Sequence, residues 1–354
     1  MSSTQRDLPQ GWSSSLWPVA AEIGLLPAGN APSRGLRGSP RTREDELHFL
    51  HAEGTLLQAR GSIFGEQVFF CLRGRRHSVL SAARLGELGF RWPADVVAVP
   101  EKVLASFAPA GHLPGLWHGR VDTSRISDST TMREAMAAGL AGGGLEVGAG
   151  ASPFPVPLAC RVLYGDRLPQ EGLLAELYPG QRACDLVIPD ILTDFDELDG
   201  VADGSQDFLI ACHVIEHTRN PIGSIAAAHR KLRPGGTLLL VIPDKQRTFD
   251  RHRPLTPLAH LIEDYLRPDR QRDLAHYEEF YRLSFPMQEP AYSQEVRHRF
   301  ETRHAIHYHV WDHDAFRLML DWLQDNVIGW SEIWTHPAVG NAQENIELYA
   351  VLTK

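Results

Sequence analysis

The sequence predicts an α/β protein whose main part is a mostly parallel sheet with helices on its faces. Two observations carry this prediction. Short apolar runs typical of buried strands alternate with helical segments between residues 145 and 242, and the first of these runs leads directly into a glycine-rich loop. Ligands of such sheets collect at the carboxyl ends of the strands, so a binding site is expected there.

The composition limits the range of functions. The chain has 354 residues, enough for two or three domains, and its formal net charge of −9 gives no reason to expect a nucleic-acid partner. The longest apolar runs are far shorter than a membrane helix, so no integral membrane segment is expected. Four widely spaced cysteines form no disulfide framework or zinc ribbon, and we expect a cytoplasmic protein.

The first part of the chain is expected to hold a leader and a small domain. Residues 1–43, rich in Ser, Gly, Pro and Arg, show no periodicity and predict a flexible leader. Residues 44–115 contain short β-like pieces and predict a β-rich accessory domain. Its aromatic residues Phe70, Phe90 and Trp92 either form the core of this domain or provide a surface on which a sugar stacks.

The second domain, residues 116–354, opens with a candidate nucleoside site. The strand Leu145–Val147 runs into Gly148-Ala149-Gly150, and glycine lets a ligand approach the backbone closely. A second strand, Arg161–Tyr164, leads to Asp166, whose carboxylate is placed to accept both hydroxyls of a ribose. A glycine pair of this kind is equally common in a simple tight turn, so the neighbouring residues must decide.

The alternation continues after this loop. A strand at Asp207–Cys212, a helix at Pro221–Leu232 and a strand at Thr237–Ile242 follow in order, and residues 330–334 and 346–352 predict a closing antiparallel pair. Between them lies an insertion, about 255–303, with helical pieces at Leu258–Leu266 and Leu274–Leu283. We expect it to cover the acceptor site as a lid.

Five motifs together resemble class I S-adenosylmethionine-dependent methyltransferases. They are Glu146-Val147-Gly148-Ala149-Gly150, Tyr164-Gly165-Asp166, Asp203 to Phe208, His213-Val214-Ile215-Glu216-His217 and Leu232-Arg233-Pro234-Gly235-Gly236. The resemblance implies a Rossmann-like, mostly parallel seven-stranded sheet whose last strand is antiparallel, with S-adenosylmethionine as cofactor. The runs from Ile242 to Pro254 and from Ile306 to Trp311 are similar to those of a bacterial subgroup linked to surface glycan biosynthesis.

The same resemblance implies roles for individual residues. Gly148, Ala149 and Gly150 would admit the methionine end of the cofactor while Glu146 braces the loop, and Asp166 would hold the ribose. Asp194 would accept from the adenine amino group and Phe195 would lie against the ring, while His213 would project into the pocket from the end of its strand. For Asp194, a role as a helix cap or turn acid is an equal alternative. The three prolines Pro153, Pro155 and Pro157 leave open how the methionine carboxylate is held.

Two histidine patterns raise the question of a metal. His213-Val214-Ile215-Glu216-His217 also fits H-x-x-E-H, the pattern of a zinc hydrolase, but it follows a strand rather than lying in a helix. His304, His307, His309 and His313 form the densest histidine cluster, and in a strand His307 and His309 would share one face. The sequence fixes no third ligand, so a polar rim of the substrate site, or histidines paired with Asp312 and Asp314, is expected ahead of the alternative of a metal site, and no metal ligand is assigned.

The proposed reaction needs an acceptor and a base. The expected acceptor is a hydroxyl of a glycan, nucleotide sugar or related small molecule, with His213, Asp244 or His307 as the catalytic base. Substrate-binding candidates are Lys245, Arg247, Arg253 and His309, unless the basic run is merely a solvated face. A non-catalytic cofactor-binding or glycan-binding protein is the alternative, and a homodimer remains open.

Overall fold

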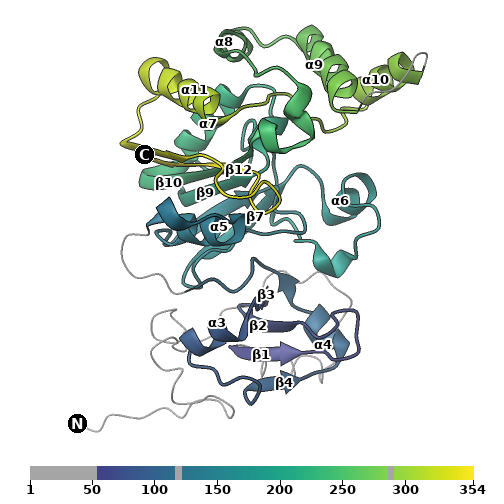
Figure 1. Cartoon of the computed structure of the whole chain (residues 1–354), viewed down its shortest axis with the longest axis vertical. Helices are drawn as coiled ribbons and strands as arrows, with labels where there is room; N and C mark the ends of the chain where they lie inside the picture. Colours follow the sequence, from purple (N-terminus) through teal and green to yellow (C-terminus); the bar gives the residue numbers. More distant parts are fainter. Residues whose placement is uncertain (1–53, 116–121, 286–290) are drawn as a thin grey trace. The chain divides into compact units, whose positions relative to one another are not determined.

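The structure, a computed structural model, describes residues 54–115, 122–285 and 291–354 (Figure 1). The predicted leader at residues 1–43 lies outside these ranges. The chain divides into two compact units, and the division does not follow a single boundary. The first unit holds the described residues up to 115 together with Gly150–Ala159 and Leu174–Val187, and the second holds the rest of the described chain.

The first unit contains a five-stranded sheet in the order β4-β1-β2-β3-β5. A two-residue turn joins β2 to β3, with Arg73 and Gly74 both at positive φ, as a tight hairpin turn requires. The elements are β1 (Thr55–Gln58), β2 (Val68–Leu72), β3 (Arg75–Ser78), α3 (Ala82–Glu87), β4 (Val96–Ala98), α4 (Glu101–Ala105) and β5 (Ala108–Pro109).

The aromatic residues of this unit have divided roles. Phe70 is buried and packs edge-on against Phe90, with ring centroids 5.8 Å apart. Both rings belong to the apolar core on one face of the small sheet. Trp92 is 51 % exposed. The core interpretation therefore holds for Phe70 and Phe90, while the indole of Trp92 lies on the surface.

Two later segments complete the first unit, which the predicted boundary at residue 115 did not foresee. Leu158 packs against the core around Phe70, and its carbonyl accepts a hydrogen bond of 2.9 Å from Arg73. Arg182 likewise donates to the carbonyl of Ile63 at 2.6 Å. These contacts join residues more than eighty positions apart, so local sequence patterns cannot predict them.

The second unit is built on a seven-stranded sheet in the order β11-β12-β10-β9-β6-β7-β8. Strands β6 to β10 pair in parallel, while β12 is antiparallel to both β10 and β11. The predicted parallel sheet with an antiparallel final strand is confirmed. The strands are β6 (Gly143–Val147), β7 (Arg161–Asp166), β8 (Ile191–Leu192), β9 (Gln206–Cys212), β10 (Leu232–Pro243), β11 (Glu332–His336) and β12 (Glu347–Thr353).

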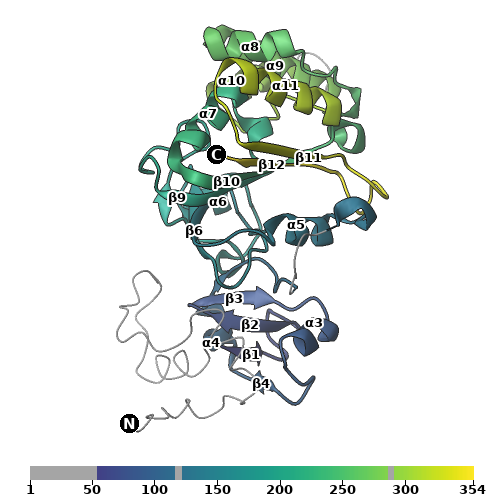
Figure 2. The same ribbon diagram turned by 90° about the vertical axis from the view of Figure 1, so that its left-hand side faces the viewer.

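Helices cover both faces of this sheet. Figure 2 shows α7 (Pro221–Lys231) and α11 (His313–Asn326) on one face and α5 (Ser129–Ala137) on the other. Asn220 caps α7 by accepting from the Gly223 amide at 2.9 Å, and Pro221 occupies the first turn, where no amide donor is needed. Burial of α7 and α11 against β9, β10 and β12 forms the main core. A short helix, α6 (Gln170–Glu176), follows β7.

The predicted insertion is helical. It consists of α8 (Leu258–Leu266), α9 (Arg270–Leu283) and α10 (Ala291–Glu301). The expected helix at Leu258–Leu266 is confirmed at both ends, and α9 begins four residues before its predicted start at Leu274. Within the described ranges, no helix combines the length and apolar character that crossing a membrane demands.

Candidate functional site

The glycine-rich loop follows β6 at the carboxyl edge of the large sheet. Gly148 and Gly150 have φ of +74° and +51°, a backbone region in which an L side chain is strained. A Cβ at Gly148 would lie 2.7 Å from Val214 Cγ2, and one at Gly150 would lie 2.0 Å from the Tyr178 hydroxyl. Both glycines are therefore required by the fold itself, in addition to any role in binding.

Asp166 ends the neighbouring strand. The Gly148 amide donates to the Gly165 carbonyl at 2.9 Å, so the loop and the carboxyl end of β7 are held side by side. One oxygen of Asp166 accepts from the Arg167 amide at 2.8 Å. Burial raises the pKa of this carboxyl, against the opposing effect of its backbone hydrogen bonds. The arrangement predicted from the sequence, a carboxylate next to the glycine loop, is present in the backbone.

The other predicted cofactor residues differ in their exposure and in the contacts they make. Asp194 is exposed just beyond β8 and accepts from the amides of Asp196 and Glu197 at 3.1 and 3.2 Å, which makes it a turn acid in this structure. Phe195 is only 2 % exposed and packs in the main core, so its ring has almost no surface to offer an adenine. Glu146 is buried within β6, as expected of a residue that braces the loop.

His213 lies at the tip of β9 in a network that the sequence did not reveal. Its φ of +54° is unusual for a residue with a side chain. Nε2 of His213 lies 2.9 Å from Oε1 of Glu347, and Nε of Arg133 lies 3.1 Å from the other oxygen of Glu347. Burial opposes a charge on His213, yet the bond to Glu347 and the nearby Glu216 raise its pKa.

Glu347 is the centre of this network. Burial by itself favours its neutral form, but hydrogen bonds from His213 and Arg133 lower its pKa to about 2. Tyr349 also donates to it, at 3.0 Å. Glu347 begins β12, far from the other members in the chain, and no sequence motif marks it.

The H-x-x-E-H pattern does not form a hydrolase site. Residues 215–217 are a single 3-10 turn after β9, so His213 and His217 are not one turn apart on an α-helix. Nδ1 of His217 donates to the Ile306 carbonyl at 2.9 Å, and His213 is engaged by Glu347. The zinc-hydrolase interpretation is therefore wrong. Glu216 is fully buried, and neither carboxylate oxygen makes a hydrogen bond within the described residues.

His307, one of the three candidate bases, is paired with a carboxylate. Its Nδ1 lies 2.6 Å from Oδ2 of Asp250, and Asp250 is in turn bound by Arg253 at 3.1 Å. The His217 ring stands edge-on to His307 with centroids 4.8 Å apart. Burial opposes ionisation of Asp250, but the bonds from His307 and Arg253 lower its pKa. Asp250 lies in the motif after β10 and could have been singled out there.

Aromatic rings surround His307. Phe249 is tilted against its ring at 4.9 Å, and Phe285 lies 5.2 Å from Phe249, both as centroid distances. Phe249 is 42 % exposed and Phe285 is 46 % exposed, which is high for such large apolar side chains. An exposed aromatic pair thus lies beside His307.

The remaining predicted substrate residues are engaged inside the fold. Lys245 is buried and donates to the Arg251 carbonyl at 3.2 Å, and Arg247 donates to the Asn345 carbonyl at 2.8 Å. Arg253 is buried and holds the carbonyl of His307 at 2.8 Å. The expectation that these cations grip an acceptor is not matched by their contacts, because each of them already fixes the backbone.

The last two predicted residues also have structural partners. Asp244 accepts from the Gln246 amide at 2.9 Å and so caps the turn after β10. His309 is fully buried and lies in a different group of side chains from His307. The expectation that these two histidines share one strand face is wrong, since residues 304–310 form no strand and pair with no sheet.

A separate groove of about 790 Å³ lies between α5 and the strands β11 and β12. It contains none of the predicted site residues. Its lining includes Met136, Trp334 and His336 together with Asp122 of the short turn before α5. The candidate site is therefore the carboxyl edge of the sheet and not this groove.

Part of the chain is similar to known proteins. Residues 145–240 match the model of a family described as a methyltransferase domain, a range that spans β6 to β10. No curated protein matches the chain. Similar solved structures include an S-adenosylmethionine-dependent methyltransferase from Thermotoga maritima, with 16 % identity, coverage of 60 % of this chain and 81 % of that one, and a TM-score of 0.33. An arsenic(III) S-adenosylmethionine methyltransferase from Chlamydomonas reinhardtii has 16 % identity, coverage of 60 % and 62 %, and a TM-score of 0.29.

Proposed function

From the premise that residues 145–240 are a methyltransferase domain with S-adenosylmethionine as its cofactor, we propose a specific reaction. The chain transfers a methyl group to a hydroxyl of a glycan, nucleotide sugar or related small molecule, and His307 is the base. The observation that carries the proposal is the hydrogen-bonded pair of His307 and Asp250, 2.6 Å apart. Asp250 of this pair comes shortly after the end of β10, and the carboxyl ends of such strands are where these sheets bind their ligands.

The residues at the sheet edge fit the cofactor. The Gly148 amide is bonded to the Gly165 carbonyl next to Asp166, and a carboxylate at the end of the second strand matches the diol of a ribose. We propose that Gly148, Ala149, Gly150 and Asp166 bind the cofactor. His213 and Asp194 follow the next strand ends and complete the set. When bound, the cofactor supplies an electrophilic methyl carbon, so the protein has to position the acceptor and remove a proton.

Of the three candidate bases, His307 fits the task best. Asp244 is used as a cap, and the bond to Glu347 raises the pKa of His213 and favours its protonated form. His307 donates its Nδ1 proton to Asp250, which fixes the tautomer and leaves Nε2 free to accept the hydroxyl proton. With the cofactor bound, the acceptor oxygen would bond to the methyl carbon as the carbon–sulfur bond breaks, S-adenosylhomocysteine would leave with that electron pair, and the hydroxyl proton would stay on Nε2 of His307.

The surroundings of His307 suit an acceptor with an apolar face. Phe249 and Phe285 expose their rings next to it, and aromatic faces of this kind stack on sugar rings and other flat apolar surfaces. This supports the glycan or related small molecule as acceptor, in contact with aromatic residues rather than with the basic run.

The test is a binding and a transfer measurement on the full chain. Calorimetry should show binding of S-adenosylmethionine and S-adenosylhomocysteine, and incubation with methyl-labelled cofactor and fractionated glycans or metabolites should label one class of hydroxyl compound. Binding without transfer to any fraction would favour the non-catalytic alternative. Absence of binding would overturn the proposal.

A further inference from the structure

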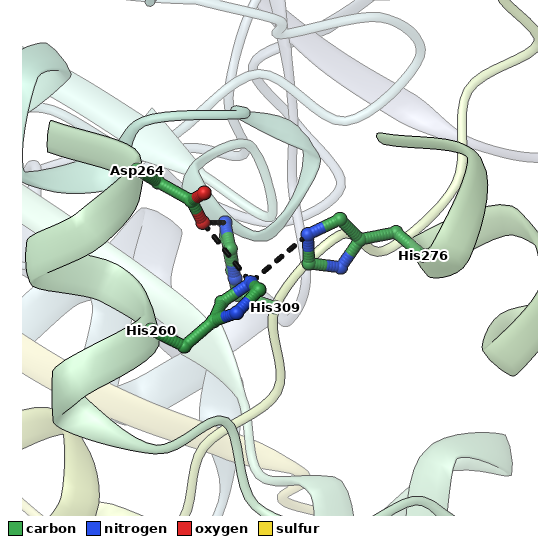
Figure 3. A group of neighbouring side chains, drawn as sticks. All are labelled: His260, Asp264, His276 and His309. Atoms are coloured by element: carbon green, nitrogen blue, oxygen red, sulfur yellow. Dashed lines mark hydrogen bonds and ion pairs between the residues drawn. The ribbon is translucent and has the colours of Figure 1, made fainter. Parts of the chain in front are cut away.

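Four side chains from distant parts of the second unit converge at a point that the proposed reaction does not use. They are His260 and Asp264 on α8, His276 on α9, and His309 in the segment before Trp311 (Figure 3). One donor atom of each lies within 4.8 Å of the donor atoms of the other three. Figure 3 shows the rings of His260 and His276 pointing toward one another, with Asp264 turned to the same point.

The spacing of the donors suits a tetrahedral metal. Nε2 of His260 lies 3.1 Å from Nε2 of His276 and 3.0 Å from Oδ2 of Asp264, while Nε2 of His309 lies 3.9 Å from that oxygen. Two ligands on a tetrahedral zinc with bonds of about 2.0–2.1 Å are about 3.3 Å apart. The observed separations bracket this value, so small shifts would seat an ion.

The four side chains also contact groups outside the cluster. The second oxygen of Asp264 lies 3.2 Å from Nε of Arg272, and the ring of His276 has a hydrogen bond to the backbone of Tyr308. Nε2 of His309 lies 3.3 Å from the Arg219 carbonyl, a contact on the ligand atom itself that an ion would replace. Metal-binding histidines are commonly oriented by such outer contacts, which direct the ligand atom to the ion.

Hydrogen bonds alone leave this group incomplete. Nδ1 of His309, on a ring with no exposed surface, is a buried atom that makes no hydrogen bond within the described residues, while Oδ2 of Asp264 meets only the ring nitrogens of this group. A buried acceptor left in this state costs about 1–3 kcal/mol. A cation at the centre would supply the partner that the protein does not.

We propose that His260, Asp264, His276 and His309 bind a divalent transition metal, with zinc as the ion that best suits three imidazoles and one carboxylate. The sequence predicted no metal because three of the ligands lie in the insertion and no spacing connects them to His309. All four positions of the tetrahedron come from the protein, so the site is structural. It ties α8 and α9 to the segment that carries His307.

The test is metal binding by the full-length chain. The protein is stripped with a chelator, exposed to zinc, desalted and analysed for zinc content; cobalt is used in parallel for its visible tetrahedral bands. We expect one zinc per chain, an increase in melting temperature with zinc, and at least a tenfold weaker affinity in His260→Gln and in His276→Gln. These two ligands are only half-buried and lie on different helices, and far-UV circular dichroism confirms that each variant is folded.

Two control variants locate the ion. His298→Gln changes an exposed histidine on α10 and should retain zinc fully. His217→Gln changes the neighbouring group of Glu216, His217 and His307, and it should also retain zinc. Wild-type chain without bound zinc, or loss in His217→Gln with retention in His276→Gln, would overturn the proposal. A chain that binds zinc here but transfers no methyl group refutes the proposed reaction alone.

Discussion

Oδ2 of Asp250 lies 2.6 Å from Nδ1 of His307, although 57 residues separate the two in the chain. Arg253 binds the same carboxylate and also the carbonyl of His307, so both members of the pair are fixed from one side. A buried carboxylate that orients an imidazole is a recurrent arrangement for a catalytic base.

Removal of the imidazole should affect turnover and not cofactor binding. We expect His307→Gln to lower kcat by about 100-fold to 10,000-fold and Asp250→Asn to lower it by less, because general-base catalysis supplies a factor of this size. The measurement is kcat at saturating cofactor, with the affinity for S-adenosylmethionine from calorimetry. His298→Gln, an exposed histidine, is the matched control. An unchanged kcat in His307→Gln would exclude this residue as the base.

Asp166→Asn should weaken cofactor binding. The amide keeps the size of the side chain but loses the charge that strengthens hydrogen bonds to the ribose, which are worth about 1.5–3 kcal/mol or about 10-fold to 100-fold in affinity. Calorimetric titration with S-adenosylhomocysteine measures the change. Asp203→Asn, at an exposed ion pair with Lys231, serves as the control and should bind normally. Equal affinity of the two variants would contradict the ribose role.

Gly148→Ala should damage both stability and binding. Its φ is +74°, and the added Cβ would meet Val214 at 2.7 Å, so strain and crowding act together. Gly204→Ala has a similar φ of +63° but open space around it, and isolates the strain, about 1–2 kcal/mol. Urea unfolding and calorimetry should show a larger loss for Gly148→Ala in both quantities. A loss no greater than that of Gly204→Ala would show that the crowding is relieved elsewhere.

Glu347 should make the fold sensitive to acid. Its pKa is about 2 in the folded chain against an ordinary 4.5, so its stabilisation is fully present above about pH 4.5 and is lost as the pH falls toward 2. Glu347→Gln should therefore lower the free energy of unfolding at neutral pH and reduce its slope in acid, as measured by urea unfolding at a series of pH values. Glu332→Gln, on the exposed edge strand β11, is the control. Parallel pH curves for wild type and Glu347→Gln would refute the assignment.

The aromatic pair should contribute to acceptor binding. We expect Phe249→Ala and Phe285→Ala to raise the acceptor KM by about threefold to tenfold with little change in kcat, as the loss of one stacking contact of about 0.5–1.5 kcal/mol implies. Leu192→Ala removes an exposed apolar side chain at β8 and should leave KM unchanged. A fall in kcat alone would indicate that the rings position His307 instead of the acceptor.

Much of the large sheet could be predicted because its strands are buried on both faces. Phe208 and Leu209 lie in an uninterrupted apolar run, and the sequence therefore predicted β9 nearly to its ends. The glycine loop and Asp166 could be predicted because each directly follows one of these strands. The short strand β1 of the first unit was missed, since four residues carry too little periodicity to stand out.

The site was predictable where its residues lie next to strand ends and not where distant segments meet. Asp250 is within a motif, but Glu347 and His276 reach their partners only through the tertiary fold. The prediction that His307 and His309 share one face of a strand was wrong for a different reason. Strand alternation was assumed, whereas the amides of Tyr308 and His309 both turn to the carbonyl of Glu216.

The first unit draws on three stretches of chain, the last of which ends at Val187. During synthesis, the hydrogen bonds of Arg73 and of the Ile63 carbonyl cannot form when the leading hundred residues emerge, because their partners come later. Completion of the first unit is thus coupled to the large sheet, because β6 and β7 are synthesised before the last segment of the first unit. A fragment that ends at residue 115 would lack two segments of the first unit, Gly150–Ala159 and Leu174–Val187. A fragment that begins there would contain these two segments without the sheet of the first unit.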